Sequence, residues 1–499
     1  KRVRPPSLKP PDCSLRALLL PMVDYYANAG GVLTPDGIEA LTTRWKLTHS
    51  EDKMVLVMVG LPARGKSFLS TRLRAFASWS GFRTRVFNAG QSRRKENSAV
   101  SPMPCSAHAS SSADFFDTKN EDAALQREQI AMGTLDELLD WLLTDGDVAI
   151  FDATNSTRAR REAVAARVGA ASAIAPIRMV FLESICDDEA VLEVNAKAKV
   201  RSSPDFKGMS EEEALTDFRQ RTKHYEDAYV TVADEEGPYI KIYNLSSKVT
   251  AKDAFGRIAR SFLPYLMAIH VTNRPIFLVA VTPEANEFVF GERKDSAGIS
   301  TCRHDDEFSV RIAAWAKEKA DNSRKGKLRI LASTKPAAIE AAARVAQAVG
   351  SRPQHFSGLN PLDRGTSTVS ADDDTRKMEF HQRYEGGGES LADLVGRLEP
   401  CLLDVEAAVD PVLVIAHVFP CRVLRTYFLG LDVAKTLYEP NSDGARALAT
   451  SEECVVELQP QLGGAYTERI HDLRRAFGER SSNGTRAADE ENARADVVS

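Results

Sequence analysis

The chain has 499 residues, of which 43% are hydrophobic and 27% charged, a globular composition with enough apolar material for two cores. Apolar stretches fall short of the roughly 18 to 20 residues of a membrane helix, and the net charge of −5 argues against a general nucleic-acid binder. Seven cysteines show neither metal-ligand spacing nor a disulfide pattern. We therefore expect a cytoplasmic protein whose partners are neither nucleic acid nor membrane. Because the chain starts at Lys1 without a methionine, the sequence leaves open where the natural protein begins.

The first half of the chain alternates strand and helix patterns. Runs of strand-type residues predict five strands, namely Met54–Val59, Thr84–Asn88, Val148–Phe151, Ile177–Leu182 and Tyr239–Tyr243. Helical spacing of apolar residues predicts helices over Ser67–Trp79 and Glu121–Leu143, the second capped by Asn120. This alternation indicates an α/β domain with a mainly parallel sheet over residues 52–250, after an N-terminal extension over residues 1–51. Its Ser-, Ala- and Pro-rich stretch Asn97–Ala113 is predicted to be a low-complexity loop.

A helical connector over residues 251–272 is expected to lead into a second α/β domain over residues 273–473. Its predicted strands are Ile276–Ala280, Leu328–Ala332 and Val412–His417, and its predicted helices are Val310–Ala320, Ala337–Val349 and Leu391–Ala407. Residues 474–499 contain little to bury, so we expect a disordered tail there.

A phosphate-binding loop follows the first strand. Its residues fit G-x-x-x-x-G-K-[ST] and read Gly60-Leu61-Pro62-Ala63-Arg64-Gly65-Lys66-Ser67. Backbone N–H groups of such a loop, with the positive end of the following helix, hold nucleotide phosphates. Lys66 would reach the β and γ phosphates, and Ser67 would bind Mg²⁺ together with Asp152 at the end of the third strand. The pattern predicts nucleotide binding and is silent on the acceptor.

Arginines recur through the first domain, at positions 93, 94, 127, 158, 160, 161, 219 and 221. Guanidinium groups match phosphate bidentately, so a phosphorylated acceptor would need several of them together. Taken singly, each fits a solvated surface position better than a binding site.

Several blocks of the first domain resemble the kinase domain of the 6-phosphofructo-2-kinase/fructose-2,6-bisphosphatase family. Besides the phosphate loop, they are Val86-Phe87-Asn88-Ala89-Gly90, Phe151-Asp152-Ala153-Thr154-Asn155, Glu183-Ser184-Ile185-Cys186-Asp187-Asp188, Ser203-Pro204-Asp205-Phe206 and Tyr225-Glu226. The resemblance implies a P-loop kinase domain followed by a histidine-phosphatase-like α/β/α domain, and transfer of the ATP γ-phosphate to the 2-hydroxyl of fructose 6-phosphate with Mg²⁺.

The resemblance also implies roles for individual residues. Lys66, Asp152 and Cys186 would be catalytic, and Asn195 and Lys199 would join the loop Gly60–Ser67 around ATP. The sugar phosphate would be bound by Arg93, Arg127, Thr154, Arg160, Arg221 and Tyr225. One position departs from the family: an ungapped count places Val200 where the family has a substrate-facing lysine, and a shift by one residue would give that role to Lys199.

The second domain departs further from the family. Where the resemblance implies Arg-His-Gly with a phosphorylated histidine, the chain has Ala280-Val281-Thr282, and Pro361 occupies the place of the proton-donating glutamate. Cys302-Arg303-His304-Asp305 reads like the missing motif but follows no buried strand, so we interpret it as a decoy. Gly388-Glu389-Ser390 and His417 remain. We therefore predict that the phosphatase activity is lost.

Three alternatives stay open from the sequence. The chain could be a non-catalytic sensor of ATP or sugar phosphates, or a P-loop kinase for another small acceptor. It could also be a bifunctional enzyme that recruits His304 or His417. The sequence does not determine the oligomeric state and leaves a homodimer open.

Overall fold

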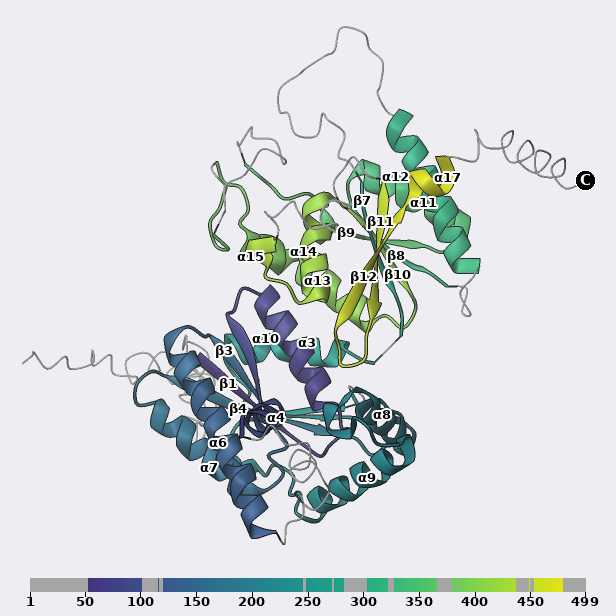
Figure 1. Ribbon diagram of the computed structural model, residues 1–499. Helices are drawn as coiled ribbons and strands as arrows, with labels where there is room; N and C mark the ends of the chain where they lie inside the picture. Colours follow the sequence, from purple (N-terminus) through teal and green to yellow (C-terminus); the bar gives the residue numbers. More distant parts are fainter. Residues whose placement is uncertain are drawn as a thin grey trace, which may run out of the picture.

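The computed structural model describes residues 53–100, 115, 120–245, 248–271, 273–281, 303–321, 327–365, 379–384, 386–436, 448 and 453–478. The predicted N-terminal extension, residues 101–113 of the predicted loop and residues 479–499 of the predicted tail lie outside these ranges. Figure 1 shows two α/β domains, one from each half of the chain. No helix within the described ranges is long and apolar enough to span a membrane.

The first domain is built on a six-stranded sheet with the order β2-β3-β1-β4-β5-β6. The strands are β1 (Lys53–Val59), β2 (Thr84–Asn88), β3 (Val148–Asp152), β4 (Ile177–Ile185), β5 (Tyr239–Tyr243) and β6 (Lys248–Lys252). β6 runs antiparallel to β5, and the other neighbours are parallel. All five predicted strands are confirmed, whereas β6 replaces the start of the predicted helical connector.

Helices cover both faces of this sheet. They are α3 (Lys66–Trp79), α4 (Ala89–Val100), α6 (Glu121–Thr144), α7 (Arg158–Ala171), α8 (Glu189–Ser202) and α9 (Glu211–Asp227). Side chains of β1 alternate between the faces, so Met54 packs with α3 while Val55 packs with α6 and α7. The predicted cap of α6 is confirmed, because Asn120 Oδ1 accepts a hydrogen bond from the Ala123 amide at 3.0 Å. α4 runs to Val100, so the predicted loop is helical over its first four residues, 97–100.

The second domain has a six-stranded sheet with the order β12-β11-β7-β10-β8-β9. The strands are β7 (Ile276–Ala280), β8 (Arg329–Ser333), β9 (Pro353–Phe356), β10 (Val412–Ala416), β11 (Cys454–Pro460) and β12 (Tyr466–Asp472). β11 and β12 form an antiparallel hairpin, and the other four strands are parallel. The three predicted strands are confirmed within one residue, and β9, β11 and β12 were missed.

Helices of the second half are α10 (Arg257–Ala268), α11 (Arg303–Asp321), α12 (Pro336–Val349), α13 (Leu391–Ala407), α14 (Val418–Leu429), α15 (Val433–Thr436) and α17 (Leu473–Gly478). α17 corrects the start of the predicted tail, since residues 474–478 are helical. The Leu473 side chain is buried, and Asp472 Oδ1 accepts hydrogen bonds from the Arg474 and Arg475 amides at 2.9 and 3.1 Å.

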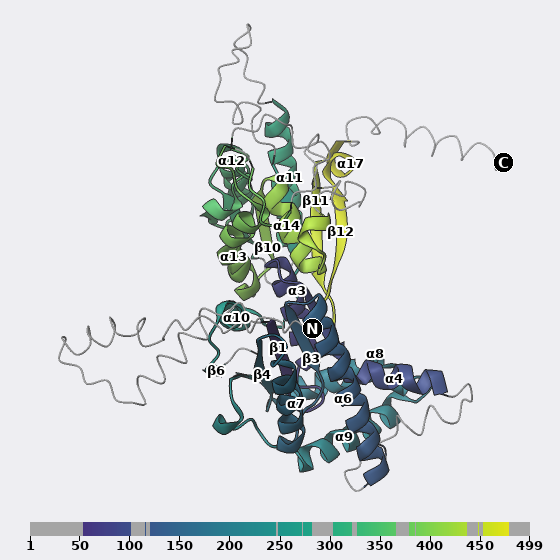
Figure 2. The ribbon, with the colours of Figure 1, turned by 90° about the vertical axis from the view of Figure 1, so that its left-hand side faces the viewer.

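One hydrophobic core joins the two domains. It contains Leu73 and Phe76 of α3, Phe262 of the connecting helix α10, and Leu398 and Leu424 of α13 and α14. Figures 1 and 2 show α3 and α10 lying between the two sheets, so the helix that follows the phosphate loop packs against both domains. The opposite face of the second sheet is covered by α11 and α12.

Candidate active site

The phosphate loop connects β1 to α3 in a curled conformation. Gly60 has φ 137°, and a Cβ there would lie 2.6 Å from the Ser184 carbonyl oxygen, so the position requires glycine. Gly65, with φ 88°, immediately precedes the first residue of α3. The Lys66 ammonium donates a hydrogen bond to the Leu61 carbonyl at 2.6 Å. Burial lowers the pKa of Lys66 to about 8, against the opposing effect of the nearby Asp152 carboxylate.

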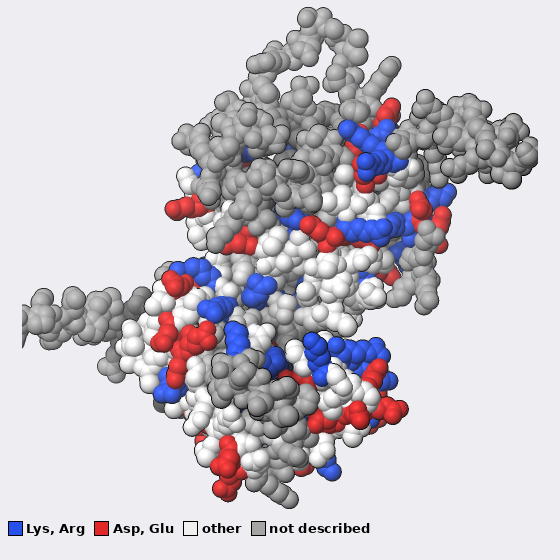
Figure 3. Space-filling model, viewed as in Figure 1, with Lys and Arg blue, Asp and Glu red and all other residues white. Residues whose placement is uncertain are grey.

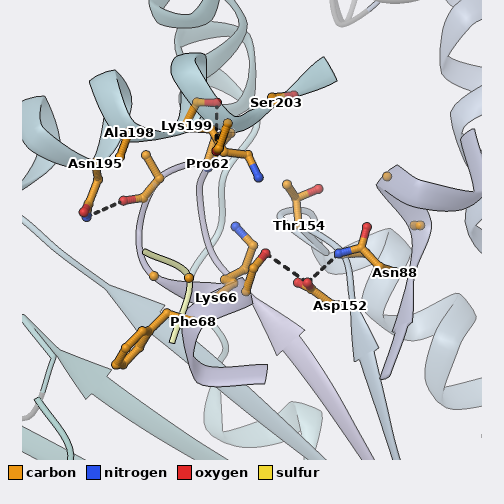
Figure 4. A pocket seen from close by; sticks show the side chains of 18 of the residues that line it. Pro62, Lys66, Phe68, Asn88, Asp152, Thr154, Asn195, Ala198, Lys199 and Ser203 are labelled. Carbon is orange, nitrogen blue, oxygen red and sulfur yellow. Dashed lines mark hydrogen bonds between the residues drawn. The ribbon is translucent and has the colours of Figure 1, made fainter. Parts of the chain in front are cut away.

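Asp152 ends β3 beside the phosphate loop. Its Oδ2 accepts a hydrogen bond from Ser67 Oγ at 3.0 Å and one from Asn88 Nδ2 at 2.6 Å, and the side chain is buried (Figure 4). Asn88 pairs with Asp152 across β2 and β3, so the parallel register brings both to one edge of the sheet. Hydroxyl and carboxylate oxygens beside a phosphate site suit Mg²⁺, which takes one or two protein ligands plus phosphate oxygens.

A cavity of about 980 Å³ opens above these groups. A cavity of this volume lies at the upper end of the ordinary range for ligand sites, which reaches about 1,000 Å³. It is lined by most of the residues predicted from the sequence, which are Pro62, Ala63, Gly65, Lys66, Ser67, Arg93, Arg127, Asp152, Thr154, Arg160, Asn195, Lys199, Arg221 and Tyr225. Residues far apart in the sequence thus meet at one edge of the sheet.

Four predicted site residues do not line the cavity: Gly60, Leu61, Arg64 and Cys186. Gly60 and Leu61 belong to the backbone of the loop, where the Leu61 carbonyl accepts the hydrogen bond from Lys66. The Arg64 guanidinium reaches Glu226 at 3.1 Å on α9. Cys186 is a buried free thiol directly after β4.

A cluster of arginines around Asp205 forms another part of the cavity wall. Arg93 Nη2 donates to Asp205 Oδ2 at 2.5 Å, and Arg94 and Arg221 approach the same carboxylate oxygen at 3.7 and 3.6 Å. Arg221 also pairs with Asp217 at 2.5 Å. Burial lowers the pKa of Arg221 despite these two carboxylates. Guanidinium groups gathered on one wall are of the kind that can pair with phosphate oxygens.

Val200 and Lys199 are neighbours on α8, but their side chains have different surroundings. Val200 is buried in a small apolar cluster with Phe206 and Phe218. Lys199 lines the cavity, and its charge contributes to the lowered pKa of Lys66 (Figure 4). This geometry favours the one-residue shift, in which Lys199 takes the place of the family lysine.

The cavity also has walls that the sequence did not predict. One comes from the connector, through His270, Val271 and Asn273, and another from the tip of the β11–β12 hairpin, residues 460–466 of the second domain. Figure 3 shows Lys and Arg side chains around the hollow between the two domains. A sequence pattern gives no signal for these contacts, because they depend on how the two domains pack.

The second domain brings Val281 and His417 together at the ends of β7 and β10. The Val281 amide donates to the Ala416 carbonyl at 2.8 Å, and the Val281 side chain is buried in the core. His417 Nε2 lies 3.1 Å from Ser333 Oγ. Burial, with the charges of Lys335 and Arg397, lowers the pKa of His417 to about 4, so the ring is neutral near pH 7.

The polar side chains near His417 are paired with other groups of the second domain. Arg397 pairs with Glu389 at 2.7 Å and donates to the Pro361 carbonyl at 2.8 Å. The helix residues Arg303–Asp305, part of the sequence interpreted as a decoy, begin α11.

Comparisons with known proteins agree with this arrangement. The profile described as 6-phosphofructo-2-kinase matches residues 42–273, and the profile described as histidine phosphatase superfamily (branch 1) matches residues 309–450. Among solved structures, a mycobacterial hydrolase covers 40% of this chain and 96% of its own, at 15% identity and a TM-score of 0.29, a similarity too distant to indicate a function.

Curated relatives match most of the chain. The 6-phosphofructo-2-kinase/fructose-2,6-bisphosphatase of Gallus gallus is 32% identical over 83% of this chain and 84% of its own length, and that of Caenorhabditis elegans is 30% identical over 81% and 89%. 6-Phosphofructo-2-kinase 1 of Saccharomyces cerevisiae is 32% identical over 77% of this chain, which spans about half (49%) of that longer protein. With its two α/β domains and its phosphate loop, the chain belongs to the 6-phosphofructo-2-kinase/fructose-2,6-bisphosphatase family.

Proposed function

We propose that this chain transfers the γ-phosphate of ATP to the 2-hydroxyl of fructose 6-phosphate, and that it does not hydrolyse the fructose 2,6-bisphosphate it makes. The observation that carries the proposal is one cavity that joins a phosphate loop, a buried Asp152 and a wall of arginines. Family membership supports the kinase reaction, and the lost histidine at Val281 supports the absence of hydrolysis.

In this proposal, the protein acts by positioning and by charge neutralisation. The loop N–H groups and Lys66 bind the phosphates of ATP, and Ser67 and Asp152 hold Mg²⁺, which neutralises phosphate charge when bound. Asp152 would also accept the proton of the attacking hydroxyl. Arg93 and Arg221 hold the 6-phosphate of the sugar, so that its 2-hydroxyl faces the nucleotide.

The acceptor distinguishes this proposal from the alternative that the chain is a kinase for another small alcohol. An acceptor without a phosphate would not need the wall of Arg93, Arg94 and Arg221 around Asp205. Incubation with MgATP and either fructose 6-phosphate or fructose, with identification of the product, tests this. We expect fructose 2,6-bisphosphate from the first and no product from the second. Equal turnover of both acceptors would contradict the proposal, and ATP binding without any transfer would support the sensor.

Replacing Arg93 by Gln should weaken binding of the sugar phosphate alone. Loss of a charge-assisted hydrogen bond to phosphate is expected to raise the KM for fructose 6-phosphate about 10- to 100-fold, with the KM for ATP within about twofold. Steady-state kinetics in both substrates measure this. Arg85→Gln is the matched control: Arg85 lies on β2, the strand directly before α4, pairs with exposed Glu137 at 3.2 Å and is outside the cavity. A rise in both KM values for Arg93→Gln would contradict the assignment.

ATP affinity should depend on the ionisation of Lys66. Because burial lowers its pKa to about 8, Lys66 is protonated at pH 7 and largely neutral at pH 9 in the free protein. Bound phosphates favour the charged form, so binding above pH 8 requires proton uptake, and the Kd for ATP should rise by up to about tenfold per pH unit. Calorimetric titrations at pH 7, 8 and 9 measure this. Lys66→Arg keeps its charge and should bind without this dependence, so a flat profile in both proteins would refute the prediction.

A further inference from the structure

Helix α3 connects the phosphate loop to the second domain. It starts with Lys66 and Ser67, and three of its later side chains donate hydrogen bonds to the second domain. Arg72 Nη2 reaches the hydroxyl of Tyr427 on α14 at 2.8 Å, Trp79 Nε1 reaches the Val423 carbonyl at 2.9 Å, and Arg74 Nη1 reaches the Gly430 carbonyl at 3.4 Å. The second half of α3 is therefore attached to α14 (Figure 1).

The centre of this attachment is a buried ion pair between Arg72 and Glu406 of α13. The side chains are 2% and 3% exposed. The Tyr427 hydroxyl lies 3.0 Å from Glu406 Oε1 and 2.9 Å from the hydroxyl of Tyr265 on α10. The Tyr265 hydroxyl donates to the backbone carbonyl of Arg72 at 3.1 Å. Side chains from α3, α10, α13 and α14 thus form one network, which we call the Arg72 network.

The Arg72 network also lines the cavity beside the phosphate loop, which we call the nucleotide cavity. Arg72, Glu406 and Tyr466 all line it, and the Arg72 guanidinium carbon lies 5.1 Å from the centre of the Tyr466 ring. Burial opposes the charge of Arg72, but Glu406 and the tyrosines outweigh it, so its pKa is raised well above the usual value. Arg72 therefore stays charged and paired.

A buried ion pair is weak support for stability as such, because apolar residues of the same volume often do as well. What it provides is a defined relative position, since a displaced partner leaves a buried charge uncompensated. Arg72 lies six residues after Lys66 on the same helix, a rise of about 9 Å. A shift of α3 against the second domain therefore displaces Lys66 and Ser67, which begin that helix.

We propose that Glu406 is a positioning residue for the kinase reaction: from the second domain, it fixes Arg72 and thereby the helix that carries the ATP-binding Lys66 and Ser67. This inference rests on the proposed function of the first domain. It gives the second domain a role that does not require phosphatase chemistry, and it predicts that damage at Glu406 weakens ATP binding rather than sugar-phosphate binding.

The test compares Glu406→Gln with Glu468→Gln in the full chain. The control breaks a similar ion pair, since Glu468 pairs with buried Arg425 of α14 at 2.7 Å within the second domain and lies outside the cavity. We expect Glu406→Gln to raise the Kd for ATP about tenfold, in the range found for residues that couple distant sites. The KM for fructose 6-phosphate and the Kd of the control should stay within twofold of wild type.

Two further experiments test the role of Glu406 independently of the Glu406→Gln variant alone. Tyr427→Phe removes one hydroxyl of the Arg72 network and leaves the ion pair in place, so it decides the question if Glu406→Gln does not fold. It should raise the Kd for ATP by a few-fold. In an Arg72→Gln background, Glu406→Gln should have no further effect, because the partner is already gone.

The binding experiment separates the two proposals. Calorimetry with ATP alone needs no turnover, so a wild type that binds ATP without phosphorylating fructose 6-phosphate would refute the proposed function and leave this test valid. An ATP Kd unchanged in both Glu406→Gln and Tyr427→Phe, or raised equally in Glu468→Gln, would overturn the positioning role of Glu406.

Discussion

Lys66→Met is expected to abolish phosphoryl transfer. The Lys66 ammonium begins α3, donates to the Leu61 carbonyl and lies beside Asp152 at the base of the cavity, where the β and γ phosphates of ATP would bind. A charge placed on the transferring group is worth several kcal/mol in a water-poor site, so kcat should fall about 10³-fold or more. Steady-state rates of fructose 2,6-bisphosphate formation measure this effect.

Lys53→Met is the matched control for this prediction. Lys53 lies at the other end of β1, donates to the carbonyls of Leu142 and Gly146 at 2.6 and 2.7 Å, and is outside the nucleotide cavity. Its loss should lower the thermal unfolding temperature and leave kcat and both KM values within about twofold, because no phosphate contact is removed. Substantial transfer by Lys66→Met, or equal loss in the control, would contradict the assignment of the ATP site.

The second large effect that we expect is the absence of fructose 2,6-bisphosphatase activity. Val281 cannot accept a phosphoryl group, and its side chain is buried in the core of the second domain. Loss of a covalent nucleophile costs on the order of 10⁶ in rate, so hydrolysis should not exceed the buffer background. Phosphate release from purified fructose 2,6-bisphosphate, with the bifunctional enzyme of Gallus gallus as the positive control, measures it.

Measurable hydrolysis would contradict this prediction. Variants His304→Ala and His417→Ala would then show which histidine had been recruited. His417 is the weaker nucleophile candidate on physical grounds, because it is buried and lies in contact with Ser333. His304 lies in the first turn of α11.

The sequence predicted the strands with unbroken apolar runs well, because their signal is local. Runs such as Met54–Val59 and Val412–Ala416 are apolar on both faces, as parallel strands between two helical layers must be. β12 was missed because it is an edge strand whose central residues are mostly exposed and polar, so it has no buried face to reveal it. β6 lies at the edge of the first sheet, and it was missed because none of its five residues is fully buried.

For the site, too, the sequence predicted the residues that have a local signal and missed the contacts that depend on the fold. Lys66, Ser67 and Asp152 belong to short motifs with a fixed position after a strand, so the sequence alone brings them together. Asp205 belongs to one of the blocks that resemble the family, but its pairing with Arg93 across 112 residues has no such signal and is seen only when the chain is folded. The Arg72 network is likewise invisible in the sequence, because Arg72 and Glu406 are 334 residues apart and each looks like an ordinary surface charge on a helix.

A time course of fructose 2,6-bisphosphate tests the central claim most directly. The purified chain is incubated with fructose 6-phosphate in excess and a limiting amount of MgATP, and the product is followed well beyond the exhaustion of ATP. If the chain is a kinase without phosphatase activity, the concentration of fructose 2,6-bisphosphate rises until ATP is consumed and then stays constant. With Lys66→Met, no product forms. A product that rises and then decays would contradict the loss of phosphatase activity, and no product at all would contradict the kinase.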